Sequence, residues 1–294
     1  MKVVGIGGGH GLAVTLQASR KFADDLAAVV TVADDGGSSG RLTRELGIPP
    51  PGDIRNCLVA LARDRELAAV YQHRFKSGAL TGHTAGNLLI AALTEMRGDF
   101  AGAVAEAGKL LRCDGRVFPA TTELVELRAQ VDGGILQGQV AVQHARSRIQ
   151  AVYLTPRAPA AHPSAVESIC NADLVVLGPG SLFTSLIATL LVPGIRRALN
   201  ETPARRVFVC NTRMQPGETG GLTAAAHLEA LLGHAGPSVT DVVLVQSPEV
   251  EPDGVGVDLH ALEFSGIEVV AADTADAAGA HDPVRLAAVL ESLA

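Results

Sequence analysis

Acidic and small residues able to bind a ribose, a phosphate or a metal lie close together in residues 34–40. Asp34 and Asp35 end an apolar run, and only glycines and serines follow them, Ser38 included. The apolar run 26–33 is rich in β-branched residues, which predicts a buried strand of a parallel sheet. Ligands of open α/β sheets bind at the carboxyl ends of such strands. The alternative is a flexible surface turn beside a solvated acid pair.

A glycine-rich turn near the N-terminus follows a second expected strand, at residues 2–7, and precedes a helix expected over 12–22. A strand, a glycine turn and a helix together form the phosphate cradle of doubly wound folds. The dinucleotide spacing G-x-G-x-x-G is not met, but Asp34 ends the next strand, where a ribose-binding acid is expected. His10 either faces a phosphate or forms a hydrogen bond at the helix start. The cradle residues are Gly8, Gly9, His10 and Gly11.

The second half of the chain repeats this pattern. A strand at 173–177 runs into Gly178-Pro179-Gly180-Ser181, and a helix is expected from Leu182. We expect Gly178, Gly180 and Ser181 to meet a phosphate, the alternative being simple N-capping by Ser181. The loop lacks the lysine of a Walker A motif, so ATP hydrolysis of that type is not implied. Two further candidates are Asn211, after a strand at 206–210, and Arg285, on a final helix capped by residues 281–283.

Polar residues also open two helices between these halves. Asp53 follows three prolines and is expected to cap a helix that runs to about residue 75, with Arg55 and Asn56 in its first turn. Asn56 either reaches a ligand or bonds local backbone. His83 and Asn87 are four residues apart and therefore share a helix face.

The middle of the chain predicts an insertion in one domain. Residues 123–142 alternate apolar and polar side chains around Asp132-Gly133-Gly134, which indicates a β-hairpin, and 149–154 adds a strand. We expect residues 1–294 to form one α/β domain. It has a Rossmann-like, doubly wound, mostly parallel sheet with helices on both faces, and residues of about 45–150 form a helical and hairpin insertion.

Composition excludes several classes of protein. The 294 residues are 47% hydrophobic and 19% charged, which is typical of a globular chain. A net charge of −7 argues against general nucleic-acid binding. Four widely separated cysteines indicate a reducing cytosol rather than a disulfide framework. Because no apolar run reaches about 18 residues, we expect no membrane insertion. The N-terminus does not resemble a signal peptide.

Six segments together resemble a known family over nearly the whole chain. They are GGGHGL (7–12), TVADDGGSSGRL (31–42), PPGDIRNCLVALA (50–62), GHTAGN (82–87), LGPGSLFTS (177–185) and QPGET (215–219). In this order they closely resemble the YvcK-like family of gluconeogenesis factors. That family is similar to the CofD family of 2-phospho-L-lactate transferases, which act on a deazaflavin precursor.

The resemblance implies a Rossmann-like fold, a cytoplasmic location, and a role in cell shape and cell-wall synthesis during gluconeogenic growth. It also implies binding of UDP-sugars such as UDP-N-acetylglucosamine, without a settled catalytic activity. The transferases usually begin with a Gly-Thr-Gly-Gly type of turn, whereas this chain has His10 after three glycines. The loop after Asp35 also differs from the longer transferase segment, and both differences argue against transferase chemistry.

We therefore expect a nucleotide-sugar-binding regulatory protein with no required cofactor. The base and ribose would lie near His10 and Asp34, and backbone N–H groups of the two glycine turns would meet the diphosphate. Expected partners are the nucleotide sugar, a second copy of the chain and a cell-wall regulatory protein. The alternative is a CofD-type transferase in which Asp34 and Asp35 hold a divalent metal. A dehydrogenase is disfavoured by the failed fingerprint, although an NAD-like nucleotide would suit the same site.

Overall fold

Seven parallel strands form the centre of the computed structural model, which describes residues 1–263 and 265–294. The strand order is β10-β9-β8-β7-β1-β2-β3. This order confirms the expected doubly wound α/β fold. The strands are β1 (Lys2–Gly7), β2 (Asp25–Val30), β3 (Arg116–Pro119), β7 (Leu174–Leu177), β8 (Arg205–Val209), β9 (Val242–Gln246) and β10 (Glu268–Ala272).

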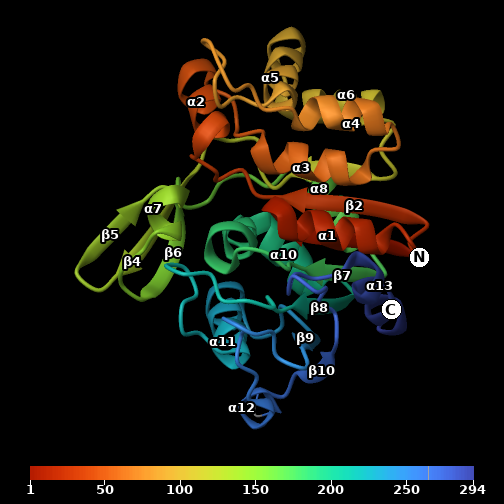
Figure 1. The fold of residues 1–294 in the computed structure, drawn as a ribbon, viewed down its shortest axis with the longest axis vertical. Coiled ribbons are helices and arrows are strands. Elements are labelled where there is room, and N and C mark those ends of the chain that lie inside the picture. The colour runs from red at the N-terminus through yellow and green to blue at the C-terminus, as the bar shows by residue number, and fades with distance from the viewer. Residues whose placement is uncertain (264) are drawn as a thin grey trace.

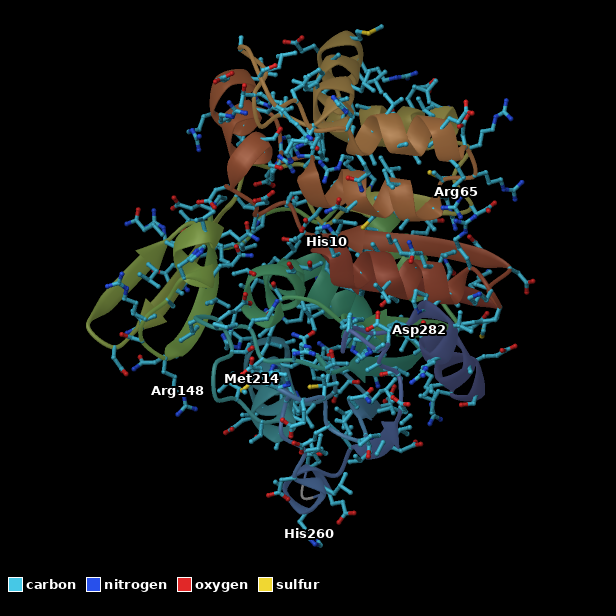
Figure 2. All side chains as sticks on the ribbon, viewed as in Figure 1. His10, Arg65, Arg148, Met214, His260 and Asp282 are labelled. Atoms are coloured by element: carbon cyan, nitrogen blue, oxygen red, sulfur yellow. The ribbon has the colours of Figure 1, made fainter. Side chains whose placement is uncertain are left out.

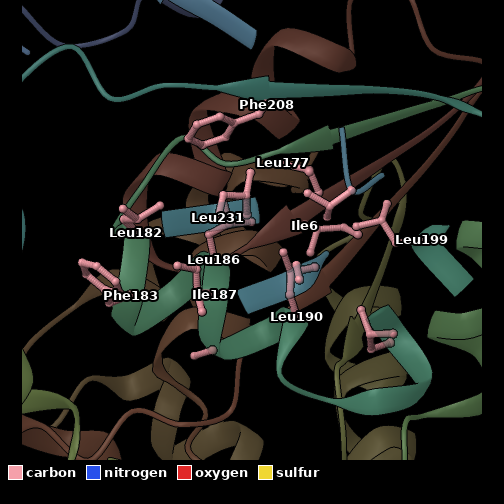
Figure 3. Packing of buried hydrophobic residues seen from close by; sticks show 14 of the residues in the cluster. Ile6, Leu177, Leu182, Phe183, Leu186, Ile187, Leu190, Leu199, Phe208 and Leu231 are labelled. Carbon is pink, nitrogen blue, oxygen red and sulfur yellow. The ribbon is translucent and has the colours of Figure 1, made fainter. Parts of the chain in front are cut away.

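Helices cover both faces of this sheet, which explains why its inner strands are apolar at nearly every position. On one face, Val3 packs with helices α1 (Gly9–Ser19), α3 (Gly52–Leu61) and α13 (Pro283–Ser292). On the other face, Ile6 and Leu177 pack against the segment that follows β7, as Figure 3 shows. That segment consists of a π-helix, η1 (Leu182–Ile187), and α9 (Ala188–Leu190); α8 (Pro163–Cys170), α10 (Pro193–Glu201) and α11 (Ala224–Ala235) complete the face.

The strand order reverses between β1 and β7. From β1 the chain continues to β2 and β3 on one side, whereas β7 leads to β8, β9 and β10 on the other. The helices that follow β1 and β7 therefore diverge at this point, which in open α/β sheets is where ligands bind. Both predicted glycine turns, 7–11 and 178–181, lie here.

A helical layer stands beyond α3 (Figure 1). It contains α2 (Gly37–Leu46), α4 (Arg65–Gln72), α5 (Ala85–Arg97) and α6 (Phe100–Leu110). The expectation of one helix from Asp53 to about residue 75 is wrong. The helix stops at Leu61, and Asp64 caps a new one by accepting a 2.9 Å hydrogen bond from the Leu67 N–H. Asp53 lies inside the first turn of α3, whose N-cap is Pro51.

A small antiparallel sheet stands apart from the main one (Figure 1). It confirms the predicted hairpin, with strand order β5-β4-β6. The elements are β4 (Glu126–Val131), β5 (Gly134–Gln137), α7 (Gln139–Gln143) and β6 (Ile149–Thr155). Region 45–150 also supplies β3 to the main sheet, which we did not expect.

A short helix, α12 (Leu259–Glu263), completes the described elements. Among the described residues, no single helix has the length and apolar composition of a membrane span. One bent pair, Leu182–Leu190 with Pro193–Glu201, passes that test only when taken together, across a 76° bend.

Candidate functional site

The two glycine turns pack directly against each other. A side chain on Gly11 would overlap the Pro179 carbonyl oxygen, and it would lie 2.6 Å from the Gly180 Cα. Gly180 has a φ of +136°, and a Cβ there would lie 3.3 Å from the Gly8 carbonyl oxygen. Glycine is required at position 11 because the two backbones approach too closely for a side chain, and at position 180 because of its positive φ. The fold thus brings residues 8–11 and 178–181 together, as the strand ends predict.

Side chains already fix the second turn. The Gly180 N–H donates to Asn211 Oδ1 at 2.9 Å, and Asn211 Nδ2 donates to the Gly180 carbonyl at 2.8 Å. Ser181 Oγ accepts a 3.1 Å hydrogen bond from Gln215 Nε2, and the Gly178 carbonyl accepts one of 2.6 Å from Thr15 Oγ1. Asn211 therefore holds the turn in shape, and the Gly180 N–H has a protein partner.

A carboxylate lies at the beginning of α1, where a phosphate was expected. The Gly9 N–H donates to the Asp53 carboxylate. Burial in the protein disfavours the charged form of this group. Burial raises the pKa of Asp53 to about 7, and the nearby charge of Asp34 adds to that effect. His10 is exposed at the same helix start (Figure 2). A ligand phosphate would therefore approach the next N–H groups, those of His10 and Gly11, beside Asp53.

Asp34 lies close to Asp53 and is bound to its own loop. Its Oδ1 accepts the Gly36 N–H at 2.9 Å, and burial raises its pKa above the usual value. Arg55 opposes that effect on both acids. Asp35, which the transferase alternative combines with Asp34 as a metal ligand, faces another element: its Oδ1 accepts the Val140 N–H of α7 at 2.9 Å. The structure instead pairs Asp34 with Asp53. Across residues 1–263 and 265–294, no three His, Cys, Asp or Glu side chains gather as metal ligands would.

A buried polar network joins α2, α3 and α5 behind these acids. Arg55 donates to Thr84 Oγ1 at 2.6 Å and to Asn56 Oδ1 at 2.6 Å. Asn87 Nδ2 donates to Ser38 Oγ at 3.1 Å. The predicted site residues Ser38 and Asn56 are thus tied to the acids through Arg55. The remaining contacts of the network are Arg55 with Asn87 Oδ1 (3.2 Å) and Ser38 Oγ with His83 Nδ1 (2.9 Å).

Arg285 contacts groups other than the glycine turns, and its expected part in this site stays a prediction. Its guanidinium pairs with the Asp273 carboxylate at 2.5 Å and donates to the Ala275 carbonyl at 2.7 Å. Both partners follow β10, and three strands separate β10 from β1 in the sheet. Sequence order placed Arg285 on the final helix but could not show which strand end its side chain would meet.

Comparison with known proteins assigns the chain to a family. A family model described as 2-phospho-L-lactate transferase CofD matches residues 3–279. The chain belongs to the CofD family. It is 44% identical over 284 residues to the gluconeogenesis factor of Bacillus subtilis (strain 168), covering 92% of this chain and 89% of that protein. The gluconeogenesis factor of Halalkalibacterium halodurans is 43% identical over 282 residues, covering 91% of this chain and 88% of that protein.

The resemblance to gluconeogenesis factors within the CofD family is thereby confirmed. The fold agrees as well. A crystal structure of a UPF0052-family protein from Bacillus halodurans matches with a TM-score of 0.95 and 39% identity, covering 99% of this chain and 98% of that one.

Two residues of this CofD-family site were missed as site residues from the sequence. Asp53 was assigned to helix capping, whereas it reaches the α1 terminus. Glu218, in the QPGET segment, is buried and accepts the Phe183 N–H at 2.7 Å and the Thr184 N–H at 2.9 Å. The motif itself was the available signal for Glu218, and the PGD sequence before α3 was the signal for Asp53.

Proposed function

We propose that this CofD-family chain is a cytoplasmic regulatory protein that binds a nucleotide sugar of the UDP-N-acetylglucosamine type. Its role would lie in cell shape and wall synthesis during gluconeogenic growth, through a cell-wall regulatory protein and a second copy of the chain. The observation that supports binding is the contact between the two glycine turns at the point where the strand order reverses. The similarity to gluconeogenesis factors supports the regulatory role.

The anion would be bound by backbone and helix rather than by lysine. Neither glycine turn contains a lysine, so the N–H groups and dipole of α1 would supply most of the stabilisation. The base and ribose would lie toward His10 and Asp34. An NAD-like nucleotide carries the same diphosphate and would compete for the same groups.

Calorimetry with UDP-N-acetylglucosamine and free N-acetylglucosamine tests this proposal. We expect only the UDP form to bind, and Gly180→Val to abolish its binding by blocking the close approach of the turns. Gly98→Val is the matched control, because Gly98 also has positive φ but a Cβ at that position would meet no atom within 4 Å. Each substitution costs about 1–2 kcal/mol of backbone strain, so an equal effect on binding would contradict the proposal.

A second candidate is the transferase activity in the family model's description. The adjoining carboxyl groups of Asp34 and Asp53 favour it, because Mg²⁺ typically binds one or two carboxylates and completes its shell with substrate phosphates. Such a cation would neutralise charge on the transferred group. In that case Asp34 and Asp53, rather than Asp34 and Asp35, would hold it.

Titrations in EDTA and in magnesium separate the two candidates. For the binding protein, Asp34→Ala weakens UDP-N-acetylglucosamine binding by about 1.5–3 kcal/mol in both buffers, the value of a charge-assisted hydrogen bond. Asp35→Asn serves as the control, because Asp35 faces α7, and it should leave affinity unchanged. Wild-type binding that vanishes in EDTA would favour the transferase. Turnover of a deazaflavin precursor with an activated phospholactate donor would establish that activity.

A further inference from the structure

A groove between the loop preceding β6 and helix α11 has the size of a small-molecule site. One part has a volume of about 480 Å³ and is lined by Arg146, Arg148 and the loop 217–223. A second part, of about 360 Å³, continues along β6 and α11. The two parts share five lining residues: Arg148, Ile149, Phe183, Leu222 and Ala226. Ligand sites typically span about 300–1,000 Å³.

The first part of the groove is cationic. The Arg146 and Arg148 side chains are exposed, and neither forms an ion pair with any described residue. Figure 2 shows Arg148 below the small sheet, away from the main body of the protein. The acid lining this part is Glu218, and its carboxylate already accepts N–H groups of η1. The two guanidinium groups therefore remain available, and the planar guanidinium matches the geometry of oxyanions such as phosphate.

The second part is largely apolar. Ile149, Ala151, Leu222 and Ala230 line it beside the Phe183 ring, together with the polar side chains of Gln150 and Glu229. At its far end, His234 Nε2 accepts the Val152 N–H of β6 at 3.0 Å, and the His234 ring lies 6.0 Å from that of Phe183. This bond joins the small sheet to α11, so the groove is bounded on both sides.

We propose that this groove binds a soluble small molecule that joins a phosphate to an apolar ring. The phosphate would lie between Arg146 and Arg148, and the ring would lie along Phe183 and Ala226. The groove shares Glu218 with the first site, but no residue of either glycine turn lines it, so it is a separate site beside the first. It stands whether or not the first binds a nucleotide sugar.

Phenyl phosphate is the probe for this site. Inorganic phosphate and phenol, which represent the two halves of that molecule, are measured separately. By calorimetry we expect phenyl phosphate to bind more tightly than phosphate, and phenol not to bind. Arg146→Ala/Arg148→Ala should weaken phenyl phosphate about tenfold or more, since it removes two charged donors. Arg44→Ala/Arg65→Ala, which removes two exposed arginines on α2 and α4, is the matched control and should have no effect (Figure 2 shows Arg65).

A second variant separates the two halves of the groove. Ala226→Leu fills the part that both volumes share, so it should block phenyl phosphate while leaving inorganic phosphate unchanged. Three outcomes would overturn the proposal: no binding of phenyl phosphate, equal binding by the double arginine variant, or displacement by UDP-N-acetylglucosamine. Displacement would mean that one site takes both ligands.

Discussion

The chemistry of the first site depends most on the carboxyl group of Asp53. It accepts the Gly9 N–H and has a pKa of about 7, so near neutral pH it exists in both charge states. When ionised, the carboxylate places a negative charge at the positive end of α1 and repels a phosphate. When protonated, it has no charge and no longer repels the phosphate. Ligand affinity at this site should therefore change with pH near neutrality.

Replacing Asp53 by asparagine should remove a pH dependence of stability. An aspartate in an unfolded chain has a pKa of about 3.9, so between that value and about 7 the folded state holds the extra proton. The stability contributed by this group is complete below the unfolded pKa and is lost as the pH rises through about 7. Asp53 keeps a minor exposed fraction, which reduces the effect.

We accordingly expect Asp53→Asn to gain about 2 kcal/mol relative to wild type between pH 5 and pH 8. Urea unfolding at both pH values measures this difference. Asp132→Asn, in the exposed turn between β4 and β5, controls for loss of an acid. Parallel pH profiles of the wild type and Asp53→Asn would show that Asp53 titrates normally.

Sequence reasoning at this scale found residues but not their pairing. Asp34 and Asp53 are 19 positions apart, and nothing in either segment shows that the loop after β2 and the start of α3 meet. Asp34 and Asp35 are adjacent in sequence, but the chain turns between them, so one faces Asp53 and the other faces α7. Side-chain direction in a loop depends on contacts that spacing alone does not contain.

At the scale of elements, the segment after β7 has the most constrained backbone. It begins at a glycine turn and continues as a π-helix, a form that is frequent at functional sites. Glu218 accepts the N–H groups of Phe183 and Thr184 in its first turn, so a side chain from another segment caps the helix. This joins the QPGET segment to the second glycine turn.

Glu218→Ala should destabilise the protein by about 2–4 kcal/mol, because two buried N–H groups lose their acceptor. Glu218→Gln should cost much less, since the amide oxygen still accepts and the cost of burying a charge disappears. Denaturant midpoints of the three proteins test this order. Equal losses in both variants would show that the carboxylate charge, rather than the acceptor, matters.

The elements most clearly predicted from sequence are those with a long pattern. The strands β1, β2, β7 and β8 and the hairpin around Asp132 all follow from apolar runs or alternation. β3 was missed because its four residues include Arg116 and Pro119, which are unusual in a strand. The break before Asp64 was missed because apolar residues continue on both sides of it, although Asp64 is itself a capping residue.

At the scale of the whole molecule, one sheet separates two hydrophobic cores. Ile6, Leu177 and Phe208 belong to one core, and Val3 and Val176 belong to the other. Alternate side chains of the same strands thus enter different cores, so neither core can form without the sheet. The glycine turns lie at the carboxyl ends of the two strands on either side of the switch point, where ligand binding would stabilise both cores.

The chain has two tyrosines and no tryptophan, which provides one reporter in a core and one in the small sheet. Tyr71 packs in the core that contains Val3, and its buried hydroxyl has no hydrogen-bond partner among the described residues. Tyr153 lies in β6 with the Arg157 guanidinium 4.1 Å from its ring centre. Tyr71→Phe should be neutral or slightly stabilising, because it removes an unsatisfied buried group. Each single-tyrosine variant then reports unfolding at one place, Tyr71 in that core or Tyr153 in the small sheet.

We expect the two variants, Tyr71→Phe and Tyr153→Phe, to give fluorescence transitions that coincide with each protein's circular dichroism transition. UDP-N-acetylglucosamine at 100 times its Kd should raise the unfolding free energy of both by about 2.7 kcal/mol. The shift should be the same for both reporters because the proposed ligand binds at the sheet that joins the two cores. A shift seen by only one tyrosine would show that the small sheet and the core around Tyr71 unfold separately and that the ligand stabilises one of them alone.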